Sequence, residues 1–164
     1  MKKFFFTLLV LVLSIFSVNA QSQYSQEEMQ TLVQRVDSLE HELSYLNLTY
    51  ELSTLNSDMT LFSNAIDIKS LEIQLNLYNR NFNSQLGYAY QRYYKSCQEK
   101  QQAFSELIEA KKTFFILKVI TYPFSENEMN TLKTSYNVID NAYESIESSM
   151  ELLKIVVDAY NNSL

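Results

Sequence analysis

The near absence of glycine and proline constrains this chain more than any other feature of its sequence. Among 164 residues there is one glycine, Gly87, and one proline, Pro123. Chains built on sheets need many glycine and proline turns, whereas the interior of a helix tolerates neither residue well. The sequence therefore predicts an all-α protein made of few, long helices.

The first twenty residues, MKKFFFTLLVLVLSIFSVNA, have the pattern of a secretory signal peptide. Two lysines precede an uncharged apolar run, Phe4–Phe16, which is shorter than the ~20 residues of a membrane-spanning helix. We expect cleavage after Ala20, a single helical-bundle domain over 21–164, and no stable membrane insertion after cleavage. The predicted location is extracytoplasmic, either periplasmic or secreted, and the mature protein is expected to be soluble. An uncleaved N-terminal anchor is the alternative.

Charge and cysteine content narrow the classes of partner. Without Lys2 and Lys3 the chain keeps 11 basic against 19 acidic side chains, a net charge of −8. Such a surface repels phosphate backbones, so we expect no nucleic acid partner. The single cysteine, Cys97, cannot form an internal disulfide. We predict that it is buried, with an interchain disulfide as the alternative.

The last segment carries the clearest helical signal. Ser125 and Glu128 match a capping box. Beyond them, apolar residues recur at alternating spacings of three and four, which is typical of coiled-coil packing. They are Met129, Leu132, Tyr136, Ile139, Tyr143, Ile146, Met150, Leu153, Val157, Tyr160 and Leu164.

The segment 86–121 is predicted to be the antiparallel neighbour of this last helix, because the link between them is short. Its lysines complement an acidic last segment, and this pattern places Lys100 near Glu147 and Lys95 near Glu151. The stretch TFFILKVITYPF, residues 113–124, is expected to be the end of a helix buried on most sides, and an exposed apolar patch is the alternative.

The first half of the domain is less regular. One predicted seam consists of Met29, Leu32, Val36, Leu39, Leu43, Leu46 and Tyr50. A second one consists of Leu61, Ile68, Leu71, Leu75, Tyr78 and Phe82. The register changes near Asn56-Ser57-Asp58, where we predict a turn or kink, or else a stutter within one unbroken helix. Because residues 76–87 also fit either a turn or a continued helix, the prediction is a three- or four-helix antiparallel bundle with coiled-coil-type packing.

Four tyrosines lie within the stretch LGYAYQRYYKSC. Helical spacing places Leu86, Tyr90, Tyr93 and Cys97 on one face, and Tyr88 one turn from Arg92 on another. Core packing is the favoured interpretation, and an aromatic site for a flat ligand such as a sugar is the alternative. If the protein has an interaction surface, we expect it here and at the following apolar end. The residues are Tyr88, Tyr90, Tyr93, Tyr94, Phe115, Val119 and Tyr122.

The remaining side chains offer little catalytic chemistry. The only histidine, His41, lies among Glu40 and Glu42 at an outward position, which disfavours histidine-dependent triads and most zinc sites. Glu106 with Glu109, and Glu144 with Glu147, lie away from the apolar seam and are expected to be solvated. We therefore expect no catalytic residues, no cofactor and no metal.

These observations favour a non-enzymatic extracytoplasmic helical bundle that acts as a protein–protein interaction or scaffold module, by self-association or with another protein. A periplasmic holdase-type chaperone is the alternative function. The layout of a signal peptide followed by long helices is similar to that of periplasmic coiled-coil chaperones, although those usually present a basic client-facing surface. An aromatic ligand-binding site and a carboxylate-based enzyme are less favoured hypotheses.

Overall fold

The protein is all-helical in the part described by a computed structural model, which comprises residues 26–121 and 124–164. Three α-helices follow one another: α2 (Gln26–Tyr78), α3 (Ser84–Thr121) and α4 (Glu126–Asn161). No strand occurs among these residues. The helices pack as a bundle, which confirms the predicted all-α class, and the described residues form three helices rather than four. The predicted signal peptide lies outside the described residues.

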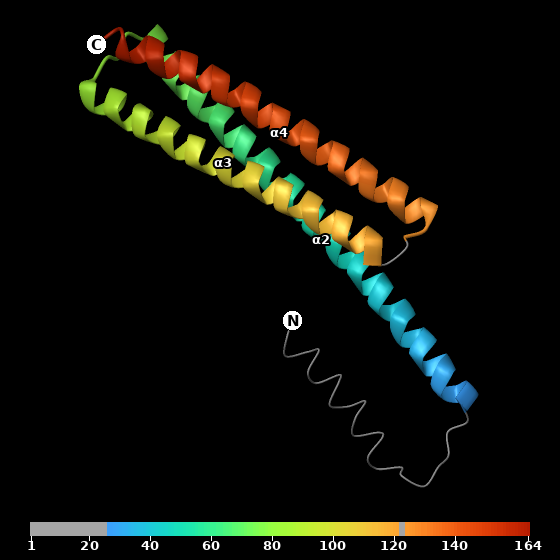
Figure 1. Cartoon of the computed structure of the whole chain (residues 1–164). Coiled ribbons are helices and arrows are strands. Elements are labelled where there is room, and N and C mark those ends of the chain that lie inside the picture. Colours follow the sequence, from blue (N-terminus) through green and yellow to red (C-terminus); the bar gives the residue numbers. More distant parts are fainter. Residues whose placement is uncertain (1–25, 122–123) are drawn as a thin grey trace. The chain divides into compact units, whose positions relative to one another are not determined.

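The chain divides after Glu42 into two compact units. In the first unit, the described apolar side chains of α2 are exposed: Met29, Leu32, Val33, Val36 and Leu39. The second unit, residues 43–164, contains the bundle, in which α3 and α4 lie side by side and the rest of α2 packs against them (Figure 1).

The face of α2 that enters the core differs from the face predicted by its periodicity. The buried residues are Leu48, Leu52, Leu55, Met59, Phe62, Ser63, Ile66, Ser70 and Ile73. In contrast, Leu46 and Tyr50 of the first predicted seam and Leu61 and Ile68 of the second are exposed. Both predicted seams were wrong as core faces. The helix carries two apolar stripes on opposite sides, and periodicity alone does not indicate which one faces the other helices.

The predicted turn or kink at Asn56-Ser57-Asp58 is absent, because α2 is a single helix through this point. Leu55 and Met59 continue the buried face across it without a gap. The core contacts therefore support the helix where the two predicted seams are separated by polar residues, which agrees with the predicted alternative of an unbroken helix.

The chain turns between α2 and α3 instead, within the asparagine-rich segment. The Asn81 N–H donates to the Asn76 carbonyl at 2.9 Å and the Arg80 N–H donates to the Leu77 carbonyl at 3.1 Å. This pattern is a Schellman motif, with Arg80 in the left-handed region at φ 53°. The Asn83 side chain then accepts from the Gln85 N–H at 2.8 Å and caps α3.

The pattern predicted for the last helix is confirmed. Ser125 and Glu128 form the capping box at the start of α4. Most of the predicted seam is buried, including Leu132, Ile139, Ile146, Leu153 and Tyr160. A regular stripe with a strong N-terminal signal was thus sufficient to define both the start of α4 and its core face.

The predicted pairing of α3 with α4 is also observed, and its start depends on Gly87. A Cβ atom at Gly87 would lie 2.5 Å from Asn161 Oδ1 and 2.7 Å from Leu164 Cδ1. The missing side chain therefore allows the start of α3 to approach the end of α4 closely.

The charged contacts between α3 and α4 differ from the predicted ones. The described residues show an ion pair between Lys112 Nζ and Asp140 Oδ1 at 3.3 Å, in place of the predicted pairs of Lys95 and Lys100. Lys100 Nζ instead lies 4.7 Å from the centroid of the Phe62 ring of α2. The long lysine side chain reaches an apolar surface of α2. The predicted ion pairs considered only α3 and α4.

Candidate functional site

The structure separates the aromatic residues of the predicted interaction surface. Tyr90 is only 3% exposed and belongs to the core. Tyr93, Tyr94 and Phe115 are partly buried and pack against that core. Tyr88 is 65% exposed, with its ring centroid 6.0 Å from the guanidinium carbon of Arg92, as the spacing predicted.

Two further residues complete this predicted set. Val119 is partly buried, and Tyr122 lies outside the described residues. Burial removes Tyr90 from any free surface of the bundle. The core-packing interpretation is confirmed for this residue, and Tyr88 is the exposed member of the tyrosine cluster.

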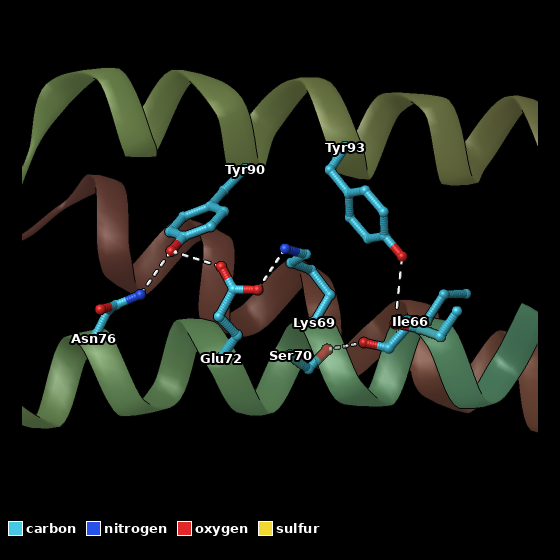
Figure 2. A network of polar contacts seen from close by, with 8 residues as sticks. Ile66, Lys69, Ser70, Glu72, Asn76, Tyr90 and Tyr93 are labelled. Carbon is cyan, nitrogen blue, oxygen red and sulfur yellow. Dashed lines mark hydrogen bonds and ion pairs between the residues drawn. The ribbon is translucent and has the colours of Figure 1, made fainter.

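Tyr90 is held by a polar network between α3 and α2 (Figure 2). Its hydroxyl accepts a hydrogen bond from Asn76 Nδ2 at 2.8 Å and donates to Glu72 Oε1 at 3.3 Å. The other carboxylate oxygen of Glu72 pairs with Lys69 Nζ. The nearby Tyr93 hydroxyl donates to the Ala65 carbonyl at 3.3 Å. These bonds satisfy the tyrosine hydroxyls and fix the register of α3 on α2.

Tyr160 connects the same layer to the α2–α3 turn. Its ring meets that of Tyr90 edge-on, with centroids 5.0 Å apart and an interplanar angle of 84°. Its hydroxyl donates to the Asn81 carbonyl at 2.7 Å and accepts from the Asn83 N–H at 3.0 Å. The end of α4 therefore holds the turn in place, and Asn76, Asn81 and Asn83 of this segment serve the fold.

The electrostatics of the cluster do not favour nucleophiles or bases. Burial raises the pKa of Tyr93 to about 12, and burial also raises the pKa of Tyr90. Cys97 is buried, as predicted. Burial raises the pKa of its thiol despite the opposing effects of Tyr93 and Lys100. At neutral pH these groups are protonated, so the cluster offers hydrogen bonds and apolar surface rather than reactive anions.

A shallow depression lies between α3 and α4 near the other end of the bundle. It has a volume of about 300 Å³ and is lined by Lys112, Phe115, Ile116, Lys133, Tyr136 and Asn137. The Tyr136 hydroxyl donates to the Lys111 carbonyl at 2.9 Å, and burial raises the pKa of Tyr136 to about 12. The tyrosine hydroxyl of this depression is thus committed to the bundle.

Close to this depression, the end of α3 is more exposed than expected. Phe114, Ile116, Leu117 and Ile120 are 44–78% exposed. The segment is helical, as predicted, but the expectation that it is buried was wrong. Phe115 and Lys118 face the other helices. The other two helices cover only this side of α3, so the apolar residues on its remaining sides stay exposed.

A second exposed apolar feature of the bundle surface is the outer face of α2. We call it the outer stripe and define it as Leu61, Ile68, Leu71, Leu75 and Tyr78, which are 59–86% exposed. Helical geometry places these residues on the side of α2 opposite Met59, Ile66 and Ile73, which are fully buried. Sequence analysis identified this stripe and assigned it to the core, because one-dimensional periodicity gives the same signal for both roles.

Chemical signatures in the described part of the chain are few. Among those residues, no group of three or more His, Cys, Asp or Glu side chains could hold a metal ion. No described helix is long and apolar enough to cross a membrane.

Comparisons with known proteins returned no match to a family model, to a curated protein or to a solved structure. The function must therefore be inferred from the geometry of the chain itself.

Proposed function

We propose that this chain is a non-enzymatic, extracytoplasmic protein–protein interaction or scaffold module. The observation that carries the proposal is the arrangement of α2, whose two opposite faces are both apolar while only one is buried. Contiguous exposed apolar residues of this extent are typical of surfaces that bind another protein. The protonated state of the buried tyrosines and of Cys97 is consistent with a structural role for these groups.

The finer architecture belongs to the same proposal. We infer that the three helices run antiparallel with coiled-coil-type side-chain packing. The support is the spacing of three and four among the buried residues of α4 and the short connections between helices. In such a frame the outer stripe is a rigid helical surface that can receive another helix.

The test of the interaction function is a capture experiment in the extracytoplasmic space of the host. Three forms are compared after gentle cross-linking: the wild type, a Leu71→Glu/Leu75→Glu variant, and the control Ile155→Glu. Ile155 is 59% exposed on α4, away from the outer stripe. We expect the wild type and the control to retain one stoichiometric protein, either another protein or the chain itself, and the double variant to lose it. Equal recovery with all three forms would contradict a role of the outer stripe.

The extracytoplasmic location has a separate test. Cleavage of the N-terminal segment predicts a mature protein that begins at Gln21. N-terminal sequencing of the protein recovered outside the cytoplasm checks this expectation. An intact Met1 on that protein would contradict signal cleavage.

A holdase-type chaperone is the second candidate, favoured by the exposed side chains at the end of α3. Phe114, Ile116, Leu117 and Ile120 would offer unfolded clients an apolar surface. Light scattering of an aggregating client at an equimolar ratio tests this function. A delay that disappears with Leu117→Glu would support the chaperone, and the absence of any delay would remove it.

A further inference from the structure

We propose that the occupant of the outer stripe is a second copy of this chain. The α2 helices of the two copies pack in opposite directions about a two-fold axis that passes between Ile68 and Leu71. This inference rests on the proposed function, because it assumes that the outer stripe is a protein-binding surface, and it specifies the partner.

The spacing of the stripe fits helix-to-helix packing. Starting from Leu61, the positions run Leu61, Asn64, Ile68, Leu71, Leu75 and Tyr78, with spacings that alternate three and four. This is a two-position heptad seam, the pattern that one helix presents to one other helix. With the axis between Ile68 and Leu71, Ile68 faces the second copy's Leu71. Farther along the seam, Asn64 faces the second copy's Leu75, and Leu61 faces the second copy's Tyr78.

The area of the stripe is sufficient for such a contact. At roughly 100 Å² of apolar surface for each exposed side chain, the stripe offers on the order of 500 Å² per copy. Two copies bury up to about 1,000 Å², which reaches the lower limit of a biological interface. A two-fold axis provides this area from one self-complementary surface, without a second kind of protein.

The charges beside the stripe select the direction and the register. Two acidic residues flank it, Asp67 on one side and Glu72 on the other. In the proposed arrangement, Asp67 lies opposite the second copy's Gln74, and Glu72 lies opposite the second copy's Ala65. No like charges meet across the seam.

The neighbouring arrangements bring acidic residues together. Parallel helices in register would place Asp67 against the second copy's Glu72, twice by symmetry. Moving the antiparallel register by one heptad places Asp67 against its own copy in one direction, and Glu72 against its own copy in the other. Each of these contacts is repulsive, so the charge pattern leaves one register without conflict.

The flanks also argue against a basic partner helix. Apart from Asp67 and Glu72, the residues of α2 beside the seam are uncharged: Thr60, Ala65 and Gln74. Glu72 is already engaged by Lys69 and by the Tyr90 hydroxyl. With Asp67 as the one other acidic flank, the seam gives a strongly charged partner little to recognise, whereas it is complementary to itself.

The first test is the molar mass of the full chain in solution, measured by sedimentation equilibrium over a range of concentrations. We expect a monomer–dimer equilibrium for the wild type. Leu71→Glu should weaken it about 100-fold or more, because the two-fold axis makes the substitution count twice. Ile155→Glu, which adds the same charge at an exposed site of α4, should leave it unchanged. Circular dichroism verifies that both variants keep the wild-type helix content.

The second test reads the register by cross-linking in a Cys97→Ala background. An Asp67→Cys chain is mixed with a Gln74→Cys chain, or with a Glu72→Cys chain, and treated with a short bis-maleimide. The proposed register predicts a heterodimeric product from the first mixture. A product from the second mixture alone would indicate parallel helices and overturn the arrangement.

The outcomes separate this inference from the proposed function. A wild type that is monomeric at every concentration, but loses a captured protein on Leu71→Glu/Leu75→Glu substitution, overturns the second copy and leaves the interaction module standing. A monomer whose capture is unaffected by that substitution overturns both. A dimer that Leu71→Glu dissociates and Ile155→Glu does not supports both.

Discussion

At the scale of single residues, the polar side chains of the core mainly form hydrogen bonds between different elements. Tyr160 binds the α2–α3 turn from α4, and Tyr90 binds α2 from α3. Ser63 joins α2 to α4 through Ser145 and Ser149, at 3.0 and 2.9 Å. Each bond connects segments that are distant in sequence, so Tyr90 within the stretch of tyrosines serves packing and register.

The left-handed conformation of Arg80 leads to a prediction about the stability of variants at this position. A residue with a Cβ is strained in this region, where glycine is not. We expect Arg80→Gly to raise the free energy of unfolding by about 1 kcal/mol relative to Arg80→Ala, measured by urea denaturation. Both variants remove the same charge, so their difference isolates the backbone. Equal stabilities would show that the turn relaxes around the alanine.

Tyr136 makes a prediction about alkaline pH. Its folded-state pKa of about 12 lies above the ordinary value of 10.0, mainly because of burial and then because of Glu51. Between these values the unfolded chain releases the phenolic proton and the folded chain retains it. This contribution to stability is therefore complete below pH 10 and is lost as the pH rises to about 12.

Comparison with Tyr136→Phe measures that contribution. We expect the wild type to lose stability more steeply than the variant between pH 10 and pH 12, as followed by chemical denaturation at each pH. The difference between the two stability curves removes the contributions of the lysines and the other tyrosines, because these residues are present in both proteins. Parallel curves would contradict the raised pKa of Tyr136.

At the scale of elements, the sequence predicted two of the three described helices well. The start of α4 followed from Ser125 and Glu128, and its core face followed from an uninterrupted stripe. The core face of α3 followed from Leu86, Tyr90 and Cys97. The helical state of α2 was partly predictable, but its buried face was not, because two apolar stripes of similar quality lie on opposite sides of it.

A pair of neighbouring substitutions tests the face assignment of α2. Leu48 is 1% exposed and Leu46 is 53% exposed, only two positions away. We expect Leu48→Ala to lower the free energy of unfolding by about 2–4 kcal/mol, and Leu46→Ala to change it by less than about 0.5 kcal/mol. Thermal and urea denaturation of both variants measure this. A larger loss of stability for Leu46→Ala than for Leu48→Ala would show that the predicted seam containing Leu46 is the buried face.

At the scale of the whole molecule, the proposed association would be linked to folding. A second copy that binds only the folded chain stabilises it by mass action. We expect the melting temperature of the wild type to rise with protein concentration, and that of Leu71→Glu to stay constant. Scanning calorimetry at several concentrations measures both. A wild-type melting temperature that does not depend on concentration would contradict a dimer in the folded state.

The sequence by itself determined that this chain is helical, where α4 begins, and which catalytic chemistries are disfavoured. These properties follow from local features: the scarcity of glycine and proline, a capping box, a single histidine and a single cysteine. The tertiary structure alone decided which face of α2 is buried and which is exposed. That choice depends on the free energy of packing three helices together. The periodicity of α2 alone does not reveal it, because the apolar spacing is similar on both of its faces.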